Sequence, residues 1–231
     1  MNFKILVLKN TLTLGKFKIY PINSGYGITI GNTLRRILLS SLYGYTVSYF
    51  KIKNILHEFT YIKGIIEDVT EIILNLKQIR FKLKKNLNIK KEKINIKINN
   101  KKNKIYAGDI EKFTKNFEII NKELVICNKD ESKKFNMKLI IDKGKGYLSS
   151  EKKKTYKNYI PIDSIYTPIK NVSFKIIHLY QKKIKYNKEI LKLNIITDGT
   201  IYPIKALMKS SKILIKIFNS FINNNKYYKY K

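Results

Sequence analysis

Apolar residues recur at helical spacing in a segment that follows Gly31 and Asn32. Asn is a favoured N-cap residue, and Gly44 lies where a left-handed C-cap would end a helix, so the pattern predicts a helix over residues 33–43. At about 100° per residue, one face of this helix carries Leu34, Ile37, Leu38, Ser41 and Leu42. The opposite face carries Arg36, Leu39, Ser40 and Tyr43, with Arg35 on the flank. A surface helix needs only one apolar face, so we expect both faces to contact partners.

Two more segments show helical spacing. Residues 64–77 place Ile65, Val69, Ile72, Ile73 and Leu76 on one face, and acidic residues in the first turns suit the positive end of the helix dipole. A last helix is predicted from Pro203, which is suited to the first helical position. Its apolar seam alternates intervals of three and four residues through Ile204, Leu207, Ser211, Leu214, Phe218 and Phe221. A seam this narrow packs helix on helix, often across a two-fold axis.

The remaining pattern is strand-like. Residues 80–104 alternate Lys and Asn with Ile and Leu, which favours solvent-facing antiparallel strands; a low-complexity linker is the alternative. Further strands are predicted before a turn at residues 144–146, over residues 171–180, and over 190–197 before the turn at Asp198–Gly199. After Phe221 we expect a disordered tail over residues 223–231. The pattern thus contains both helices and strands.

The charge of the chain leaves two interpretations open. Its 231 residues include 48 Lys and Arg against 16 Asp and Glu, a formal net charge of +32. Such an excess indicates an anionic partner such as nucleic acid, or else lysine accumulated by drift in an AT-rich genome. Arginine occurs only at Arg35, Arg36 and Arg80, whereas a nucleic-acid binder would spread arginines over its contact surface. The three arginine positions are therefore expected to need the guanidinium fork.

Three motifs of the chain partly match nucleotide-binding or metal-binding patterns. Gly25, Gly27 and Gly31 approximate a dinucleotide-binding turn, but no βαβ alternation surrounds them, so we interpret them as a tight turn before a helix. His57–Glu58 lacks the second histidine of a zinc-protease motif. The acidic residues Glu67, Asp68 and Glu71 are interpreted as exposed or partner-facing carboxylates rather than metal ligands. We expect no independent catalytic site and no metal.

Cys127 is the only cysteine, which excludes a disulfide within the chain and favours a buried structural thiol. No apolar run approaches the roughly 20 residues of a membrane-spanning helix, so we expect no membrane. The N-terminus has the layout of neither a signal peptide nor a transit peptide.

Taken together, a set of motifs resembles the RNA polymerase alpha subunit family of bacteria and plastids. In order these are GYGITIGNTLRRILLSS, ILHEFTYIKGIIEDVTEIILNLK, YAGDI, LVIC, DKGKGYL, PIDSIYTPIKNVSFKI and ITDGTIYPIKAL. The resemblance covers most of residues 16–206, and its first two blocks are the most specific. It implies a scaffold that forms a homodimer and carries the two catalytic large subunits, beta and beta-prime. The implied fold is of the α+β class: a discontinuous sheet-and-helix dimerisation domain, residues 1–50 and 165–222, with an inserted mostly β domain at residues 51–164.

The resemblance also implies residue roles. The dimer interface would use the first and last helices, through Leu34, Arg35, Ile37, Leu38, Ser41, Leu42, Leu207, Ser211, Leu214, Phe218 and Phe221. Docking of beta or beta-prime would use Asn32, Arg36, Leu39, Ser40, His57, Glu58, Glu67, Asp68, Asn75, Lys77, Lys145, Gly146 and Tyr147. The polymerase magnesium would be held by the large subunits, so no cofactor is expected in this chain.

The sequence also departs from the family pattern. It ends at Lys231 without the family's DNA-binding carboxy-terminal domain, so contact with DNA is expected only through the assembled polymerase. Ile204 and Lys205 stand where the family usually has acidic residues after Pro203. The composition favours a plastid location, with the cytoplasm of an AT-rich bacterium as the alternative. Two alternative functions stay open: a lysine-rich RNA- or DNA-binding protein, and an enzyme that binds a nucleotide at the glycine turn.

Overall fold

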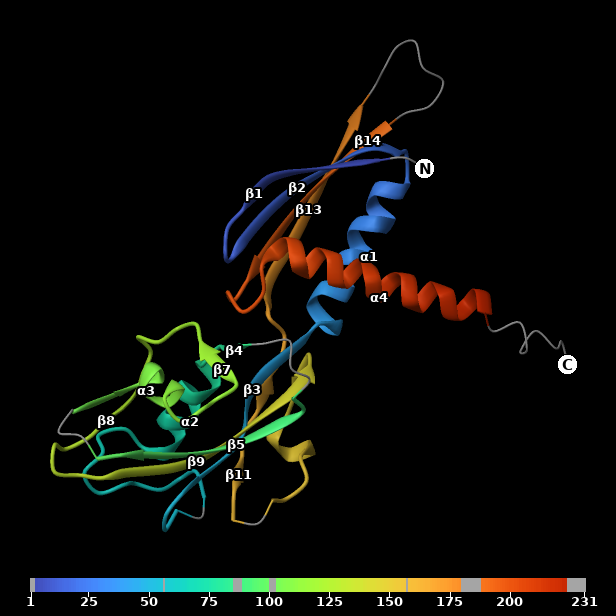
Figure 1. Ribbon diagram of the computed structural model, residues 1–231. Coiled ribbons are helices and arrows are strands. Elements are labelled where there is room, and N and C mark those ends of the chain that lie inside the picture. The colour runs from blue at the N-terminus through green and yellow to red at the C-terminus, as the bar shows by residue number, and fades with distance from the viewer. Residues whose placement is uncertain are drawn as a thin grey trace, which may run out of the picture. The chain divides into compact units, whose positions relative to one another are not determined.

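The structure is a computed structural model that describes residues 3–55, 57–84, 89–99, 103–156, 158–179 and 188–223. The chain divides into two compact units (Figure 1). The first unit joins Met1–Leu42 to Thr167–Lys231, and the second is Tyr43–Tyr166. Helices and mostly antiparallel sheets occur in both units, so the α+β class is confirmed.

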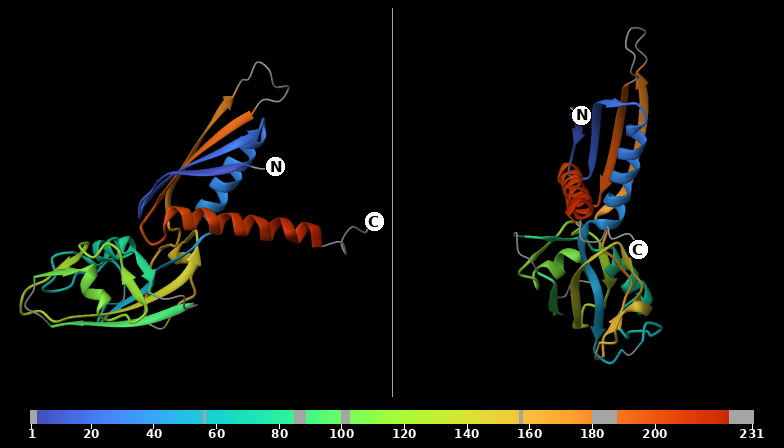
Figure 2. Two further views of the ribbon diagram at one scale, coloured as in Figure 1. Left: turned by 45° about the horizontal axis from the view of Figure 1, so that its top comes forward. Right: turned by 90° about the vertical axis from the view of Figure 1, so that its right-hand side faces the viewer.

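The first unit is built on a four-stranded antiparallel sheet in the order β1-β2-β14-β13. Its strands are β1 (Lys4–Asn10), β2 (Leu14–Asn23), β13 (Ile169–Leu179) and β14 (Lys188–Thr197). Alternate side chains of β2 are buried, among them Phe17 and Ile19, as expected for a sheet with one covered face. The helices α1 (Tyr26–Ser41) and α4 (Pro203–Asn223) pack against each other and supply the rest of this core (Figure 2).

Helix α1 begins earlier than predicted. It starts after Gly25, whose φ of 87° places it in the left-handed region, so Gly27, Gly31 and Asn32 lie inside the helix. The predicted N-cap at Asn32 is therefore wrong, and so is the turn interpretation of Gly27 and Gly31. A Cβ on Gly31 would lie 2.7 Å from the ring of Phe174, so glycine is required here for close packing on the sheet.

The C-terminal boundary of α1 also differs from the prediction. The helix ends at Ser41, and its C-cap residue Leu42 is extended. Tyr43 and Gly44 belong to strand β3 (Tyr43–Ile52), so Gly44 is not a C-cap and Tyr43 does not share a helix face with Arg36. The whole of β3 lies in the second compact unit, which begins at Tyr43, eight residues before the expected start of the inserted domain at residue 51.

The second unit is built on a sheet in the order β11-β3-β9-β5, where β5 is Lys91–Ile98, β9 is Phe135–Lys145 and β11 is Ile160–Pro161. Three two-stranded ladders join β4 (Phe81–Leu83) to β7 (Phe117–Ile119), β6 (Lys104–Tyr106) to β8 (Val125–Asn128), and β10 (Tyr147–Leu148) to β12 (Ser164–Ile165). The helices are α2 (Val69–Gln78), α3 (Ala107–Glu111) and the 3₁₀ turn η1 (Ser150–Lys152). Their apolar side chains form a second core, which includes Phe50, Leu76 and Phe117.

Several local predictions can now be compared with the structure. The described residues between 80 and 104 form strands rather than a linker, and α4 begins at Pro203 as predicted. Helix α2 begins at Val69 instead of Gly64, because Asp68 is its N-cap and accepts a hydrogen bond from the backbone N–H of Glu71 at 2.7 Å. Of the predicted tail, Asn223 ends α4 and residues 224–231 lie outside the described part of the chain.

Candidate interaction surfaces

The N-terminus of α1 is occupied by a carboxylate from the same chain. Glu189 on β14 is buried, and its oxygens accept the backbone N–H of Gly25 and of Gly27, each at 2.9 Å. Burial alone would raise the pKa of Glu189, but these N–H groups, with His178 and Ser24, hold it below its ordinary value. The N–H groups that a phosphate would need are thus already bonded to a negative charge. The geometry gives no support to a nucleotide site at the glycine motif.

The predicted dimer residues of α1 differ in exposure. Leu34, Leu38 and Leu42 are buried in the core of their own unit, Ile37 and Ser41 are half-buried, and Arg35 is exposed. The three leucines therefore pack beneath the surface of α1, and they offer little side-chain area to a second chain. Their assignment to a dimer interface stays a prediction.

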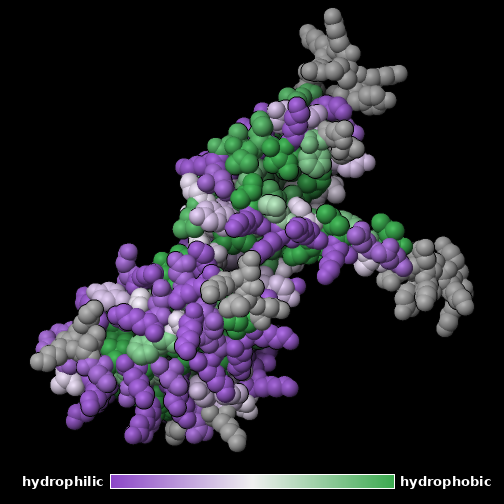
Figure 3. All heavy atoms as spheres, in the orientation of Figure 1, coloured by the Kyte–Doolittle hydropathy of each residue, from purple (hydrophilic) through white to green (hydrophobic). Residues whose placement is uncertain are grey.

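Helix α4 changes character along its length. Leu207 is buried and Ser211 and Leu214 are half-buried, so the first half packs on its own unit. Phe218 and Phe221 are 57% and 64% exposed, and Ile215 and Ile222 are exposed beside them. Figures 1 and 2 show this half extending beyond the sheet, and Figure 3 shows hydrophobic side chains along it. Such a patch marks an interaction surface in a soluble protein.

The docking residues predicted on α1 lie on its open side. Asn32, Arg36 and Ser40 are exposed and Leu39 is half-buried. The hydroxyl of Ser40 donates to the backbone carbonyl of Arg36 at 2.8 Å, and the Arg36 residue is itself exposed. This side chain is available as a planar donor for a carboxylate or carbonyl of a partner.

Docking residues predicted in the second unit include some that are engaged internally. Glu67 accepts the backbone N–H of Asn128 at 2.6 Å, and Asn75 donates to the carbonyl of Ile126 at 3.0 Å. These contacts tie the start of α2 and the helix itself to β8. His57 and Asp68 are exposed and Glu58 is half-buried. Within this block, Glu67 and Asn75 are engaged in bonds to β8, whereas His57 and Asp68 are exposed and accessible to a partner.

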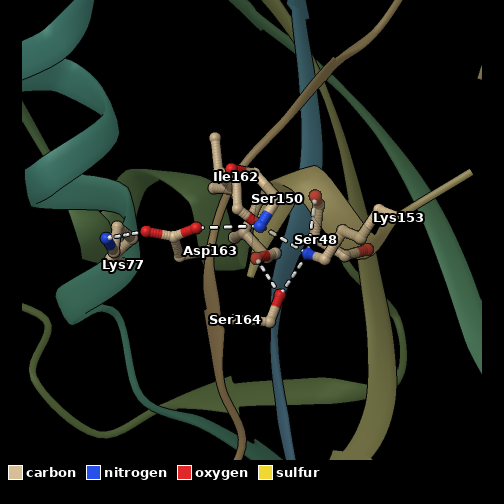
Figure 4. Close-up of polar contacts among 8 residues, drawn as sticks. Ser48, Lys77, Ser150, Lys153, Ile162, Asp163 and Ser164 are labelled. Carbon is tan, nitrogen blue, oxygen red and sulfur yellow. Dashed lines mark hydrogen bonds and ion pairs between the residues drawn. The ribbon is translucent and has the colours of Figure 1, made fainter. Parts of the chain in front are cut away.

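Lys77 also has an internal partner. Its ammonium contacts Asp163 at 3.0 Å, and the other carboxylate oxygen of Asp163 accepts the backbone N–H of Ser150 at 2.8 Å (Figure 4). The hydrogen bond from Ser150 and the ion pair with Lys77 lower the pKa of Asp163 to about 2. Lys77 therefore joins α2 to the segment that precedes β12.

The predicted docking loop Lys145–Tyr147 connects β9 to β10. Gly146 has a φ of 61°, in the left-handed region that favours glycine. Lys145 is exposed over the ring of Tyr43 at 4.5 Å, and Tyr147 is exposed at the start of β10. The carbonyl of Gly146 accepts the backbone N–H of Tyr166 at 2.8 Å, so the loop is tied to the chain that follows β12.

Sequence reasoning missed part of these surfaces. Four apolar side chains of the second unit are exposed within or near the predicted docking block: Phe59, Tyr61, Ile66 and Leu74. Leu74 falls outside the apolar face of α2, a signal that could have marked it. The sequence also does not indicate the contacts of Glu189, Lys153 and Asp163. Glu189 binds the backbone N–H of Gly27, Lys153 binds the backbone carbonyl of Ser48, and Asp163 binds the side chain of Lys77. All of these partners are distant in sequence, so no local pattern points to them.

Cys127 and the His, Asp and Glu side chains are the groups that catalysis or metal binding would use. Among the described residues, no three His, Cys, Asp or Glu side chains are grouped as a metal site would require. Cys127 is buried, and burial raises its pKa to about 12, so it is a thiol rather than a nucleophilic thiolate at neutral pH. In the part of the chain that the structure covers, no helix is long and apolar enough to cross a membrane.

Comparison with known proteins identifies the family. Residues 50–167 match the family model for the RNA polymerase Rpb3/RpoA insert domain. The chain is 48% identical over 225 residues to the DNA-directed RNA polymerase subunit alpha of Cytophaga hutchinsonii, covering 96% of this chain and 67% of the relative. The alpha subunits of Phocaeicola vulgatus and Clostridium kluyveri are 45% and 42% identical, over 94% and 90% of this chain and 66% and 65% of theirs. The chain thus spans about two thirds of the length of these relatives. It belongs to the family of DNA-directed RNA polymerase alpha subunits.

Proposed function

We propose that this chain is the scaffold subunit of a DNA-directed RNA polymerase, which forms a homodimer and docks the beta and beta-prime subunits. Family membership supports the polymerase role. The observation that supports a scaffold most directly is the exposed apolar half of α4, because a soluble helix with this surface requires a partner. The alternative of an independent RNA- or DNA-binding protein receives no support from the relatives.

The homodimer is proposed to form through α4, with α1 beneath it. Phe218 and Phe221, together with Ile215 and Ile222, offer the largest apolar side chains to a second copy. Strand β1 adds to this need for a partner, since Ile5, Leu6, Val7 and Leu8 are exposed on an edge strand. Exposed apolar edge strands promote aggregation unless another chain covers them.

The large subunits are proposed to dock on two sets of residues that are polar or mixed in character. One is the exposed face of α1 that carries Arg36. The other lies in the second unit, where His57, Asp68 and Tyr147 are exposed alongside Phe59 and Tyr61. Aromatic side chains and arginine often provide most of the binding energy at protein interfaces.

The cellular location follows from the polymerase that the chain would join. The expected plastid location is not confirmed, because the relatives compared come from bacteria. We propose the bacterial alternative, in which the subunit acts where a bacterial polymerase transcribes.

A reconstitution experiment tests this function. The tagged chain is mixed with beta and beta-prime, and the complex is analysed by mass spectrometry under native conditions. We expect two copies of the chain with one copy of each large subunit. Recovery of the chain without either large subunit would contradict the proposal.

Substitution of Arg36 tests the docking surface separately from the dimer. We expect Arg36→Ala to weaken capture of a large subunit at least tenfold, since an exposed interface arginine is a frequent hot spot, while the dimer stays intact. Titration of the tagged dimer with beta and with beta-prime measures capture, and sedimentation measures the dimer. Lys175→Ala is the control because Lys175 is an exposed cation of the same unit that belongs to neither proposed surface, and its capture should equal that of the unsubstituted chain. Dissociation of the Arg36→Ala dimer would contradict the assignment of Arg36 to docking.

A further inference from the structure

The docking loop Lys145–Tyr147 is held by a very short ladder. Strand β10 has two residues and pairs with the two residues of β12, with Tyr147 opposite Ile165 and Leu148 opposite Ser164. One more backbone bond, from Tyr166 to the carbonyl of Gly146, continues this pairing. Lys145 itself ends β9 and pairs with Tyr43 on β3. An isolated two-stranded ladder is marginally stable in water, so the position of Gly146 and Tyr147 depends on what holds β12.

Strand β12 is held by the ammonium of Lys153. This group donates to the hydroxyl of Ser164 at 2.6 Å, to the carbonyl of Ser48 on β3 at 3.1 Å and to the carbonyl of Ile162 (Figure 4). The Ser164 hydroxyl in turn donates to the carbonyl of Val47 at 3.3 Å. The side chain of Lys153 therefore joins β12, the residue two positions before it, and β3.

The number of acceptors matches the number of protons on the ammonium. Lysine offers three N–H donors when it is charged, and Lys153 contacts three oxygens. Burial lowers the pKa of Lys153 to about 8, although Asp142 and Asp163 act in the opposite direction. Desolvation of a cation is costly, and an apolar side chain would avoid that cost. We therefore interpret the charge of Lys153 as fixing the position of β12 rather than as raising the stability of the second unit.

A second contact holds the same segment from the other side. Asp163 lies between Ile162 and Ser164, and it joins Lys77 on α2 to the backbone N–H of Ser150. The residues on both sides of Asp163 are the ones that Lys153 binds. The segment 162–164 is therefore fixed to α2 and to β3 immediately before the chain pairs with the docking loop.

We propose that Lys153 is the positioning residue of the docking loop, because its ammonium fixes β12 to β3 and β12 in turn holds Gly146 and Tyr147 in place. This inference rests on the proposed function, in which the loop contacts a large subunit. It predicts that loss of the ammonium loosens the loop while the rest of the second unit stays folded.

Hydrogen exchange of the dimer, together with large-subunit capture, tests the proposal. In Lys153→Met we expect the amides of Leu148 and Tyr166 to exchange roughly tenfold faster, since hydrogen bonds to a charged group are lost. The amides of β5 and β9 should keep their protection, and capture should weaken by a similar factor. Lys153→Arg, which restores a charged donor, should recover much of both effects. Lys154→Met is the matched control because Lys154 is an exposed lysine in the same segment.

Each outcome separates the inference from the proposed function. Unchanged exchange at the loop would overturn the role of Lys153, whatever happens to capture. Faster exchange throughout β5 and β9 would also overturn it, since Lys153 would then stabilise the unit as a whole. Faster exchange confined to the loop with unchanged capture would overturn docking through this loop, so the failure would lie in the proposed function. If Lys153→Met does not fold, Asp163→Asn provides the same readout, with a smaller increase expected at the same amides.

Discussion

Glu189 and the glycines of α1 form one arrangement at the scale of single residues. Without a side chain, Gly27 leaves room for the carboxylate, since a Cβ there would lie 2.6 Å from a Glu189 oxygen. The same carboxylate satisfies two N–H groups that the first turn of a helix otherwise leaves unpaired. A negative charge at this end of the helix is also favoured by the helix dipole. Glu189 therefore determines where α1 begins.

This arrangement predicts a pH-dependent stability difference for Glu189→Gln. The pKa of Glu189 in the folded chain is below its ordinary value of 4.5, so its contribution to stability is present above that value and is lost as the pH falls through the folded pKa. We expect Glu189→Gln to lower the free energy of unfolding by about 1–3 kcal/mol at neutral pH, with a smaller difference at pH 3. Urea unfolding of both proteins from pH 3 to pH 7 measures this. A difference that does not change with pH would contradict it.

The sequence contained part of this information. Gly27 and Gly31 are four residues apart, and Leu34 and Leu38 continue the same face, so the spacing could have indicated one longer helix. The capping carboxylate could not be predicted, because Gly27 and Glu189 are separated by 162 positions. Asn32 has the local preference of an N-cap residue, but the contact of Glu189 with the N–H groups of Gly25 and Gly27 favours an earlier start of the helix.

At the scale of elements, α4 combines two functions in one continuous helix. Its first half is anchored by Ala206, Leu207 and Ser210, which are buried in the first unit. Its second half has apolar side chains on more than the predicted seam, since Ile215 and Ile222 are exposed beside Phe218 and Phe221. The folding of the helix can thus rely on the first half while the second remains available for association.

This division predicts that Phe218→Glu separates the dimer without unfolding the chain. Phe218 is exposed in the single chain, so the substitution costs little there, but an unpaired charge buried between two chains is strongly unfavourable. We expect the dimer dissociation constant to rise at least a hundredfold, with unchanged circular dichroism, as measured by sedimentation equilibrium. Lys216→Glu, at an exposed lysine of the same helix, is the control and should leave a dimer. A stable Phe218→Glu dimer would show that the two copies meet elsewhere.

The sequence predicted which elements exist better than where they end. The alternating strands and the start of α4 at Pro203 followed from period and proline chemistry. The start of α2 was misplaced because its apolar pattern continues backwards through Ile65, which is buried in a bridge to Lys129 and not in the helix. Likewise, Lys77 was predicted to dock, but its partner Asp163 could be identified only after folding.

At the scale of the whole molecule, the exposed half of α4 and the docking loop belong to different units, while Arg36 on α1 places a second proposed docking surface in the first unit. The first unit carries the exposed half of α4, and the second carries the docking loop with the contacts of Lys153 and Asp163 that hold it. The chain enters the second unit at Tyr43 and leaves it at Tyr166, so the two surfaces are attached to different cores. Substitutions on one surface can therefore be tested while the other unit serves as an internal control.

The net charge of +32 acts on the molecule as a whole, and it predicts how stability depends on salt. Like charges repel one another in the compact state, and raising sodium chloride from about 20 to about 200 mM screens this repulsion. We expect the thermal midpoint to rise by a few degrees, as scanning calorimetry of the dimer would measure. A falling midpoint would mean that attractive ion pairs dominate. Tripolyphosphate at about 1 mM adds little ionic strength, so a comparable rise with it alone would reveal a bound anion. If only sodium chloride is effective, the lysine excess acts as a diffuse field, which agrees with a scaffold whose specific contacts are proposed at Arg36 and α4.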